Sequence, residues 1–111
     1  MAAINAYRMD GLGNDFIIID RREKFIEIKK SKIIELGNRA NIGFDQIIFI
    51  EKQKEGSYPI TIYNSDGGEV SACGNGARCV AYLLSENLNT KKIQIKSYRG
   101  LRSISRSLLQ K

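Results

Sequence analysis

The amino-acid sequence predicts an α+β domain in which a mainly antiparallel sheet packs against one buried helix. Apolar runs of strand length are joined by short polar connections, and only two stretches have helical periodicity. In the second stretch, apolar side chains between residues 77 and 84 cover much of the helix circumference, so the sheet should bury this helix. Short connections favour antiparallel pairing, because a parallel crossover needs about a dozen residues or more.

The expected elements can be placed along the chain from these patterns. Ser31 can cap a helix that ends near Asn38, and Asp66-Gly67-Gly68 is a strong signal for a tight hairpin turn. That turn leads through a short extended piece into the buried helix, whose first turn is residues 74–76. Residues 101–111 alternate poorly and leave strand, helix and frayed tail open. Strands are expected at residues 4–9, 16–20, 46–50, 59–63 and 92–96, with a glycine-bearing loop at residues 10–15.

Composition indicates one ordinary globular domain. The 111 residues include 42 % hydrophobic and 27 % charged side chains, and no apolar run is long enough to span a bilayer. No signal-peptide pattern is present and two free thiols suit a reducing compartment, so we expect a cytoplasmic protein. Residues 91–111 hold seven basic side chains and no acidic one. This segment suits either a nucleic-acid contact or a solvated surface; without a stacking-aromatic pattern, we expect the solvated surface.

The absence of histidine restricts the possible chemistry. It excludes Ser-His-Asp and Cys-His catalysis, and two cysteines alone cannot form the usual four-ligand zinc site. Cys73 stands where the chain turns into the buried helix, and the unpaired N–H groups of a helix start bind anions and lower the pKa of a thiol. Cys73 is therefore a candidate thiolate base or nucleophile, more reactive than Cys79 within the helix. The alternative is a small buried residue at a tight corner.

Several side-chain amides stand beside glycines at expected strand or helix ends. If these ends converge on one rim of the sheet, the amides would offer uncharged donors and acceptors to a zwitterionic ligand. The alternative is that each amide only satisfies its own turn. The residues are Asn14, Gln46, Asn64 and Asn75.

Three motifs in this order resemble diaminopimelate epimerase, and the resemblance runs from about residue 4 to residue 100. The family usually has histidine where Asp10 stands and glycine where Asn41 stands. The motifs are Gly11-Leu12-Gly13-Asn14-Asp15-Phe16, Ile42-Gly43-Phe44-Asp45-Gln46 and the run from Tyr63-Asn64-Ser65-Asp66-Gly67-Gly68 to Cys73-Gly74-Asn75-Gly76-Ala77-Arg78-Cys79.

The resemblance implies an isomerase that interconverts LL- and meso-diaminopimelate in lysine and peptidoglycan-precursor biosynthesis, with no cofactor and no metal. It implies two similar domains, each with a mixed sheet curled around a central helix and each giving one cysteine to one face of the substrate α-carbon. By resemblance, Cys73 is the catalytic cysteine of the N-terminal domain. The positions that would hold substrate are Asn14, Gln46, Asn64, Gly74 and Asn75.

The family chain is more than twice as long, and its second cysteine motif does not occur in this sequence. The resemblance therefore implies an N-terminal domain at residues 1–100, followed at residues 101–111 by a basic tail or a remnant of the second domain. We expect the chain to be inactive alone, unless a C-terminal domain or a second copy supplies the other thiol. A non-catalytic ligand-binding remnant and another amino-acid racemase of the same fold are the alternatives.

Overall fold

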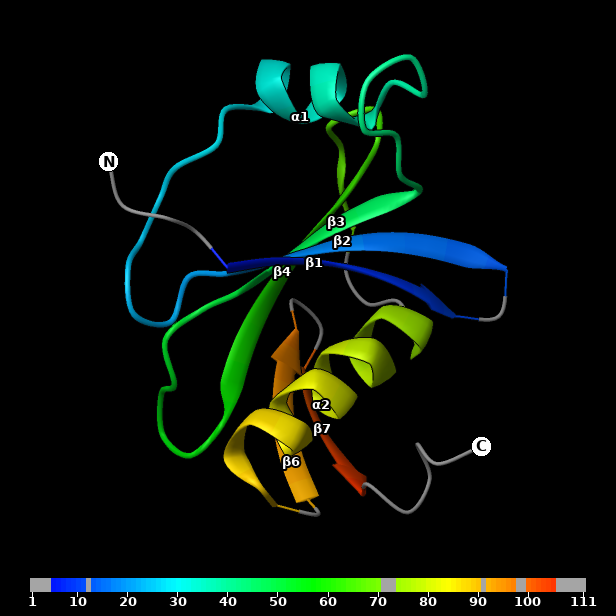
Figure 1. Cartoon of the computed structure of the whole chain (residues 1–111). Coiled ribbons are helices and arrows are strands. Elements are labelled where there is room, and N and C mark those ends of the chain that lie inside the picture. The colour runs from blue at the N-terminus through cyan, green and yellow to red at the C-terminus, as the bar shows by residue number, and fades with distance from the viewer. Residues whose placement is uncertain (1–4, 12, 71–73, 91, 98–99, 106–111) are drawn as a thin grey trace.

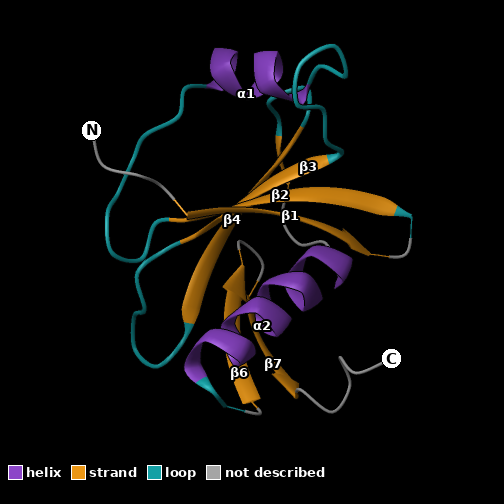
Figure 2. Ribbon diagram, in the orientation of Figure 1, coloured by secondary structure: helices purple, strands orange, loops and turns teal. Residues whose placement is uncertain are grey.

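The computed structural model describes residues 5–11, 13–70, 74–90, 92–97 and 100–105. It contains two helices and a mixed sheet, arranged as Figures 1 and 2 show. The elements are β1 (Asn5–Gly11), β2 (Asn14–Asp20), α1 (Lys30–Gly37), β3 (Gln46–Ile50), β4 (Tyr58–Asn64), β5 (Glu69–Val70), α2 (Gly74–Leu88), β6 (Lys92–Ser97) and β7 (Gly100–Ser105).

The strands follow the order β1-β2-β3-β4-β6-β7, and the short β5 pairs with β4. The β2–β3 and β4–β6 pairs are parallel and the other pairs are antiparallel. Helix α2 contacts β1 at one edge of the sheet and β6 next to the other edge, so the sheet curls around α2. The predicted α+β class, with a mainly antiparallel mixed sheet around a central helix, is confirmed.

Each face of the sheet has its own apolar core, because alternate residues of a strand point to opposite faces. On one face, Phe16 and Ile18 of β2 pack with Leu84 of α2, in a cluster we call the α2 core. On the other face, Ile47 of β3 packs with Ile33 of α1, in a cluster we call the α1 core. Figure 1 shows the two helices on opposite sides of strands β1–β4. The apolar runs of β2 and β3 are nearly continuous because both of their faces are covered.

Three local expectations were wrong. Ser31 lies inside α1, whose N-cap is Lys29 and has no side-chain cap hydrogen bond. Most of the expected loop at residues 10–15 belongs to β1 and β2, which stay paired as far as Gly11 and Asn14. Pro59 is the second residue of β4, not the first, and its carbonyl oxygen accepts a hydrogen bond from the Glu51 N–H. In the two strand cases, pairing with a neighbouring strand extends the element beyond the local pattern.

The C-terminal elements bear on the expected domain boundary at residue 100. Strand β7 starts at Gly100 and pairs with β6 as far as Ser105 opposite Lys92. The division of the chain into residues 1–100 and 101–111 stays a prediction. In the described part of the chain, no helix is long and apolar enough to cross a membrane.

Candidate functional site

Three of the predicted amides lie at the same end of the neighbouring strands β2, β3 and β4. Gln46 is the first residue of β3 and Asn64 the last of β4, and the two are Cα partners across the strands. The Gln46 Nε2 donates a hydrogen bond of 3.0 Å to the Asn64 Oδ1. Asn14 begins β2 and stands two residues before Phe16, which is the β2 partner of Gln46. We call Asn14, Gln46 and Asn64 the rim amides.

The rim amides also share one face of the sheet. Phe16, Ile48 and Ile62 belong to the α2 core. Each rim amide stands two residues from one of these side chains, so strand alternation turns all three amides toward the α2 face. Figure 1 shows α2 beginning on the side of the molecule where β1 ends and β2 begins. The start of a helix, with its unpaired N–H groups, therefore lies on the face that the amides share.

The side-chain amide oxygen of Gln46 is an unused acceptor at this end of the strands. This atom, Oε1, is buried and, among the described residues, has no hydrogen-bond partner. A buried acceptor without a donor costs free energy, on the order of 1–3 kcal/mol. A ligand N–H or ammonium group placed beside the rim amides could supply that donor.

The remaining predicted site residues fall at the start of α2. Gly74 and Asn75 are its first two residues, as the sequence predicts. Cys73 lies outside the described residues, and it directly precedes Gly74 in the chain. Cys79 is buried in the α2 core.

The turn that follows β4 fixes the backbone of Asn64. The Asn64 N–H donates to the Gly68 carbonyl oxygen, and the Gly67 N–H donates to the Asn64 carbonyl oxygen, each at 2.9 Å. The Asp66 Oδ1 accepts from the Gly68 N–H at 2.8 Å. Gly67 has φ +87°, and a Cβ there would come within 2.6 Å of the Lys30 Cγ. The hairpin turn predicted at residues 66–68 is confirmed, and the positive φ at residue 67 favours glycine there.

Beside the rim amides lies an ion-pair network that sequence reasoning missed. Asp15 pairs with Arg8 at 3.1 Å and with Arg39 at 2.8 Å, and Arg39 also reaches Asp45 at 3.0 Å. The two aspartates bind each other's backbone. The Asp15 N–H donates to the Asp45 Oδ2 at 2.9 Å, and the Asp45 N–H donates to the Asp15 Oδ1 at 2.8 Å. We call Arg8, Asp15, Arg39 and Asp45 the rim brace.

The electrostatics of the rim brace favour the charged forms of Asp15 and Arg39. The hydrogen bond from Arg39 lowers the pKa of Asp15 well below its usual range; burial opposes this, and hydrogen bonds from Asp45 add to it. In return, the hydrogen bond with Asp15 raises the pKa of Arg39. One signal in the sequence could have found the brace: Asp15 and Asp45 each stand next to a predicted amide at the start of an apolar run.

A hollow of about 440 Å³ opens beside the rim brace. Asn14 is the only rim amide among its lining residues, so the hollow adjoins the row of amides without enclosing it. In the described residues, no group of three or more His, Cys, Asp or Glu side chains is placed to hold a metal ion. The lining residues are Asp10, Gly13, Asn14, Asp15, Arg39 and Asp45.

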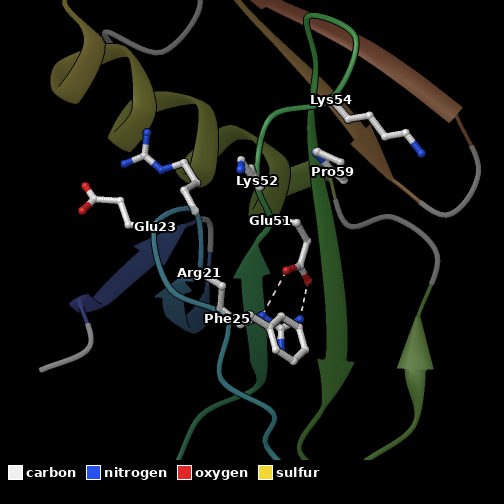
Figure 3. Close-up of a pocket in the computed structure, with 8 residues that line it drawn as sticks. Arg21, Glu23, Phe25, Glu51, Lys52, Lys54 and Pro59 are labelled. Carbon is white, nitrogen blue, oxygen red and sulfur yellow. Dashed lines mark hydrogen bonds and ion pairs between the residues drawn. The ribbon is translucent and has the colours of Figure 1, made fainter. Parts of the chain in front are cut away.

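The opposite end of strands β2 to β4 carries a second hollow, of about 420 Å³, and none of the predicted site residues that the structure describes lines it. Figure 3 shows Arg21 hydrogen-bonded to Glu51 there, with the Phe25 ring beside it. The Arg21 guanidinium carbon lies 4.5 Å from the Phe25 ring centroid and 4.2 Å from that of Phe49. The Thr61 hydroxyl donates to the Glu51 Oε2 at 2.9 Å. We call Arg21, Phe25, Phe49 and Glu51 the far-end cluster.

Solved structures with a similar fold come from phenazine biosynthesis proteins. A PhzC/PhzF protein of Clostridium difficile aligns with a TM-score of 0.70 at 20 % identity, over 94 % of this chain and 40 % of that chain. A PhzF-family protein of Enterococcus faecalis aligns with a TM-score of 0.69 at 14 % identity, over 92 % of this chain and 40 % of that one. At these identities the likeness concerns the fold alone.

Sequence comparison is more specific. Residues 6–107 match the family described as Diaminopimelate epimerase. The diaminopimelate epimerase of Pelagibacter ubique is 47 % identical over 97 residues, which are 87 % of this chain and 35 % of that protein. That of Chromobacterium violaceum is 41 % identical over 99 residues, 85 % of this chain and 36 % of that protein. The chain thus spans about a third of the length of these relatives, and it belongs to the diaminopimelate epimerase family.

Proposed function

We propose that this chain forms one side of a diaminopimelate epimerase site and interconverts LL- and meso-diaminopimelate when a second thiol is supplied. The observation that carries the proposal is the row of rim amides on the face of the sheet where α2 begins. Cys73 immediately precedes that helix in the sequence. Family membership supports the same assignment.

The proposed reaction moves one proton across the substrate α-carbon. The Cys73 thiolate removes the α-proton, so the C–H bond breaks and its electron pair stays on carbon and spreads into the carboxylate. A thiol on the opposite face then donates its proton to the carbon and becomes a thiolate. N–H groups at the start of α2, at Gly74 and Asn75, are suited to stabilise the carboxylate charge that develops between the two steps.

The rim amides are suited to bind the ammonium and carboxylate groups of the substrate. The amino-acid centre of diaminopimelate carries an ammonium donor and a carboxylate acceptor. Asn14, Gln46 and Asn64 offer both donors and acceptors without a net charge. The unused Gln46 Oε1 is an acceptor for an N–H of the ligand. The isolated chain would therefore grip its substrate through uncharged polar contacts.

The second thiol has two possible sources in this proposal. The first is a C-terminal domain, since the relatives are about three times as long as the matched region. The second is another copy of this chain, placed by a two-fold axis so that two Cys73 thiols face one cleft. The cytoplasmic location expected from the sequence belongs to the same proposal.

Domain replacement tests the proposal. The chain would take the place of the matched third of the Pelagibacter ubique enzyme, and conversion of LL- to meso-diaminopimelate would be followed by chiral chromatography. We expect the chimera to convert the substrate and the 111-residue chain alone to leave it unchanged. Cys73→Ala should abolish conversion in the chimera, whereas Cys79→Ala should retain most of it because Cys79 is buried in the α2 core, within the helix and past its start.

The alternatives have their own outcomes. A folded chimera that binds diaminopimelate without turnover would favour the non-catalytic binding module. Turnover of other amino acids in a substrate panel, without diaminopimelate, would favour a different racemase. Sedimentation of the chain over a concentration series, with the assay run on the same samples, separates the two thiol sources: activity that rises with the dimer fraction requires the second copy.

A further inference from the structure

We propose that the rim brace is a positioning device: Arg8, Asp15, Arg39 and Asp45 set the geometry of the rim amides without touching the ligand. The proposal rests on the proposed function, because it assigns the rim amides to the ligand. It concerns residues that the sequence analysis gave no role.

Chain adjacency is the first argument. Asn14 precedes Asp15, and Gln46 follows Asp45, so two rim amides are covalently joined to the two aspartates of the brace. Asn64 precedes Ser65, whose N–H donates to the Asp45 carbonyl oxygen at 3.2 Å. Every rim amide is therefore one residue away from a contact made by the brace.

The backbone hydrogen bonds give the second argument. The strands β2 and β3 are parallel, so no hairpin turn fixes one beside the other where they begin. The two hydrogen bonds between Asp15 and Asp45 join the segments that lead into β2 and β3, next to the Phe16–Gln46 pair. A third bond runs from the Asp45 N–H to the Asp15 carbonyl oxygen at 3.1 Å. These bonds set how far Asn14 and Gln46 stand from each other.

The saturation of the carboxylates distinguishes positioning from ligand binding. The Asp15 oxygens accept from Arg8, from Arg39 and from the Asp45 N–H. The Asp45 oxygens accept from Arg39 and from the Asp15 N–H. All four carboxylate oxygens are thus engaged within the brace. A ligand would have to break these charge-assisted bonds to reach either aspartate.

The arginines hold the two like charges together. Without a cation, two carboxylates so close would repel each other. Arg39 binds both of them, and Arg8 ties Asp15 to the loop before β3 through the carbonyl oxygens of Ile42 and Gly43, at 2.9 and 2.8 Å. Gly43 lies against the Arg39 side chain, so that a Cβ at residue 43 would come within 2.8 Å of the Arg39 Cδ. The loop is therefore shaped to admit the arginine.

Arg39→Gln tests the proposal, with Lys32→Gln as its matched control. Both side chains are exposed, 60 % for Arg39 and 54 % for Lys32, and each forms a surface ion pair. Only Arg39 adjoins the rim amides. The first readout needs no ligand: the side-chain NH₂ signals of Asn14, Gln46 and Asn64 in ¹H–¹⁵N spectra of the 111-residue chain. We expect Arg39→Gln to shift and broaden them and Lys32→Gln to leave them unchanged.

The second readout is the affinity for meso-diaminopimelate, measured by calorimetric titration. We expect Arg39→Gln to weaken binding by about tenfold or more, since a small misplacement of positioning groups has effects of this size or larger. Lys32→Gln should bind like the parent. Arg39→Lys, which keeps the charge but loses the two-point contact with Asp15, should fall between them.

The outcomes separate the two proposals. A parent chain that does not bind diaminopimelate overturns the proposed grip of the isolated chain, while the NMR readout still decides the role of the brace. Unchanged amide signals in folded Arg39→Gln overturn the brace proposal, as does parent-like affinity where the parent binds. If Arg39→Gln does not fold, Arg39→Lys carries both measurements under the same criteria.

Discussion

The two ends of strands β2, β3 and β4 use the same residue types for different tasks. At the rim, the carboxylates accept backbone N–H groups from a neighbouring strand start, and Arg39 is 60 % exposed. At the far end, the Arg21 side chain is only 10 % exposed and lies between the rings of Phe25 and Phe49. An exposed arginine adds little stability but can fix geometry, whereas a buried one is part of the packing.

This difference predicts which property, stability or ligand binding, a substitution at each end should change. Loss of a far-end residue removes packing and leaves a partly buried charge without its partner, so stability should fall. Loss of a rim residue changes the relative placement of two strand starts, so ligand binding should suffer more than stability. The following predictions test this division, from the largest expected effect to the smallest.

Arg21→Ala should have the largest effect on stability. It leaves Glu51 without its arginine and removes the guanidinium from between two aromatic rings. We expect the free energy of unfolding to fall by about 3 kcal/mol, as for a mostly buried ion pair that loses one partner. Urea unfolding followed by circular dichroism measures it. A loss no greater than that caused by Arg39→Gln would contradict the contrast between the two ends.

Two glycines with positive φ, one at the rim and one at the far end of the strands, allow a direct comparison of the two ends. Gly43 at the rim has φ +73°, and a Cβ there would meet the Arg39 side chain at 2.8 Å and its Cα at 3.0 Å. Gly56, in the turn between β3 and β4 at the far end, has φ +80° and nothing within 4 Å of such a Cβ. Gly56→Ala should cost about 1 kcal/mol from conformation alone.

Gly43→Ala should cost about 2 kcal/mol, because crowding against Arg39 adds to the same conformational strain. It should also weaken diaminopimelate binding, which Gly56→Ala should leave unchanged. Thermal unfolding and calorimetric titration of both variants give the comparison. Equal losses of stability would show that the space under Arg39 is not restrictive.

Asp15→Asn should reveal a stability contribution that depends on pH. The pKa of Asp15 is lowered in the folded chain, and an unfolded aspartate titrates near about 3.9. A lowered pKa stabilises the fold above the unfolded pKa, and this contribution is lost as the pH falls from there toward the folded pKa. We expect the parent to be more stable than the variant by about 1 kcal/mol at pH 7.

That difference should shrink as the pH falls below about 4, because Asp15 of the unfolded parent then binds a proton while folded Asp15, with its lowered pKa, stays charged, and the variant has no carboxyl group at this position. Unfolding free energies of both proteins at several pH values from 7 to 3 measure it. The parent should lose stability over this range for a second reason, since hydrogen bonds from Arg22 lower the pKa of Asp20 despite its burial. A parent–variant difference that stays constant with pH argues against the ion pairs of Asp15.

Phe25→Ala should have the smallest effect. Phe25 is 67 % exposed, and the Arg21 guanidinium also contacts the ring of Phe49, which is buried in the α1 core. An exposed cation–π contact is worth about 0.5–1 kcal/mol, so we expect a loss near the lower value. Urea unfolding of Phe25→Ala beside Arg21→Ala provides the measurement. A loss as large as that of Arg21→Ala would place the packing energy in the outer ring instead of the buried arginine.

Local sequence patterns predict most of the helices and strands and much of the candidate site. Strand β3 and the start of α2 follow from local patterns, and the turn at residues 66–68 follows from its glycines. Placing Asn14, Gln46 and Asn64 at strand ends needed only the apolar runs beside them. These features depend on neighbours within a few residues, which is why periodicity and turn chemistry reveal them.

Which strand ends meet, and which contacts hold them together, depends on long-range packing. The rim brace depends on the parallel register of β2 and β3, which sets Phe16 opposite Gln46. Asp15 and Asp45 are thirty positions apart in the chain, and Arg8 reaches loop carbonyl groups even farther away. No local pattern encodes such contacts, because the register is set by packing both faces of the sheet against α1 and α2. The same long-range packing buries Arg21 between two rings and leaves Arg39 exposed, although both are arginines in polar stretches of the sequence.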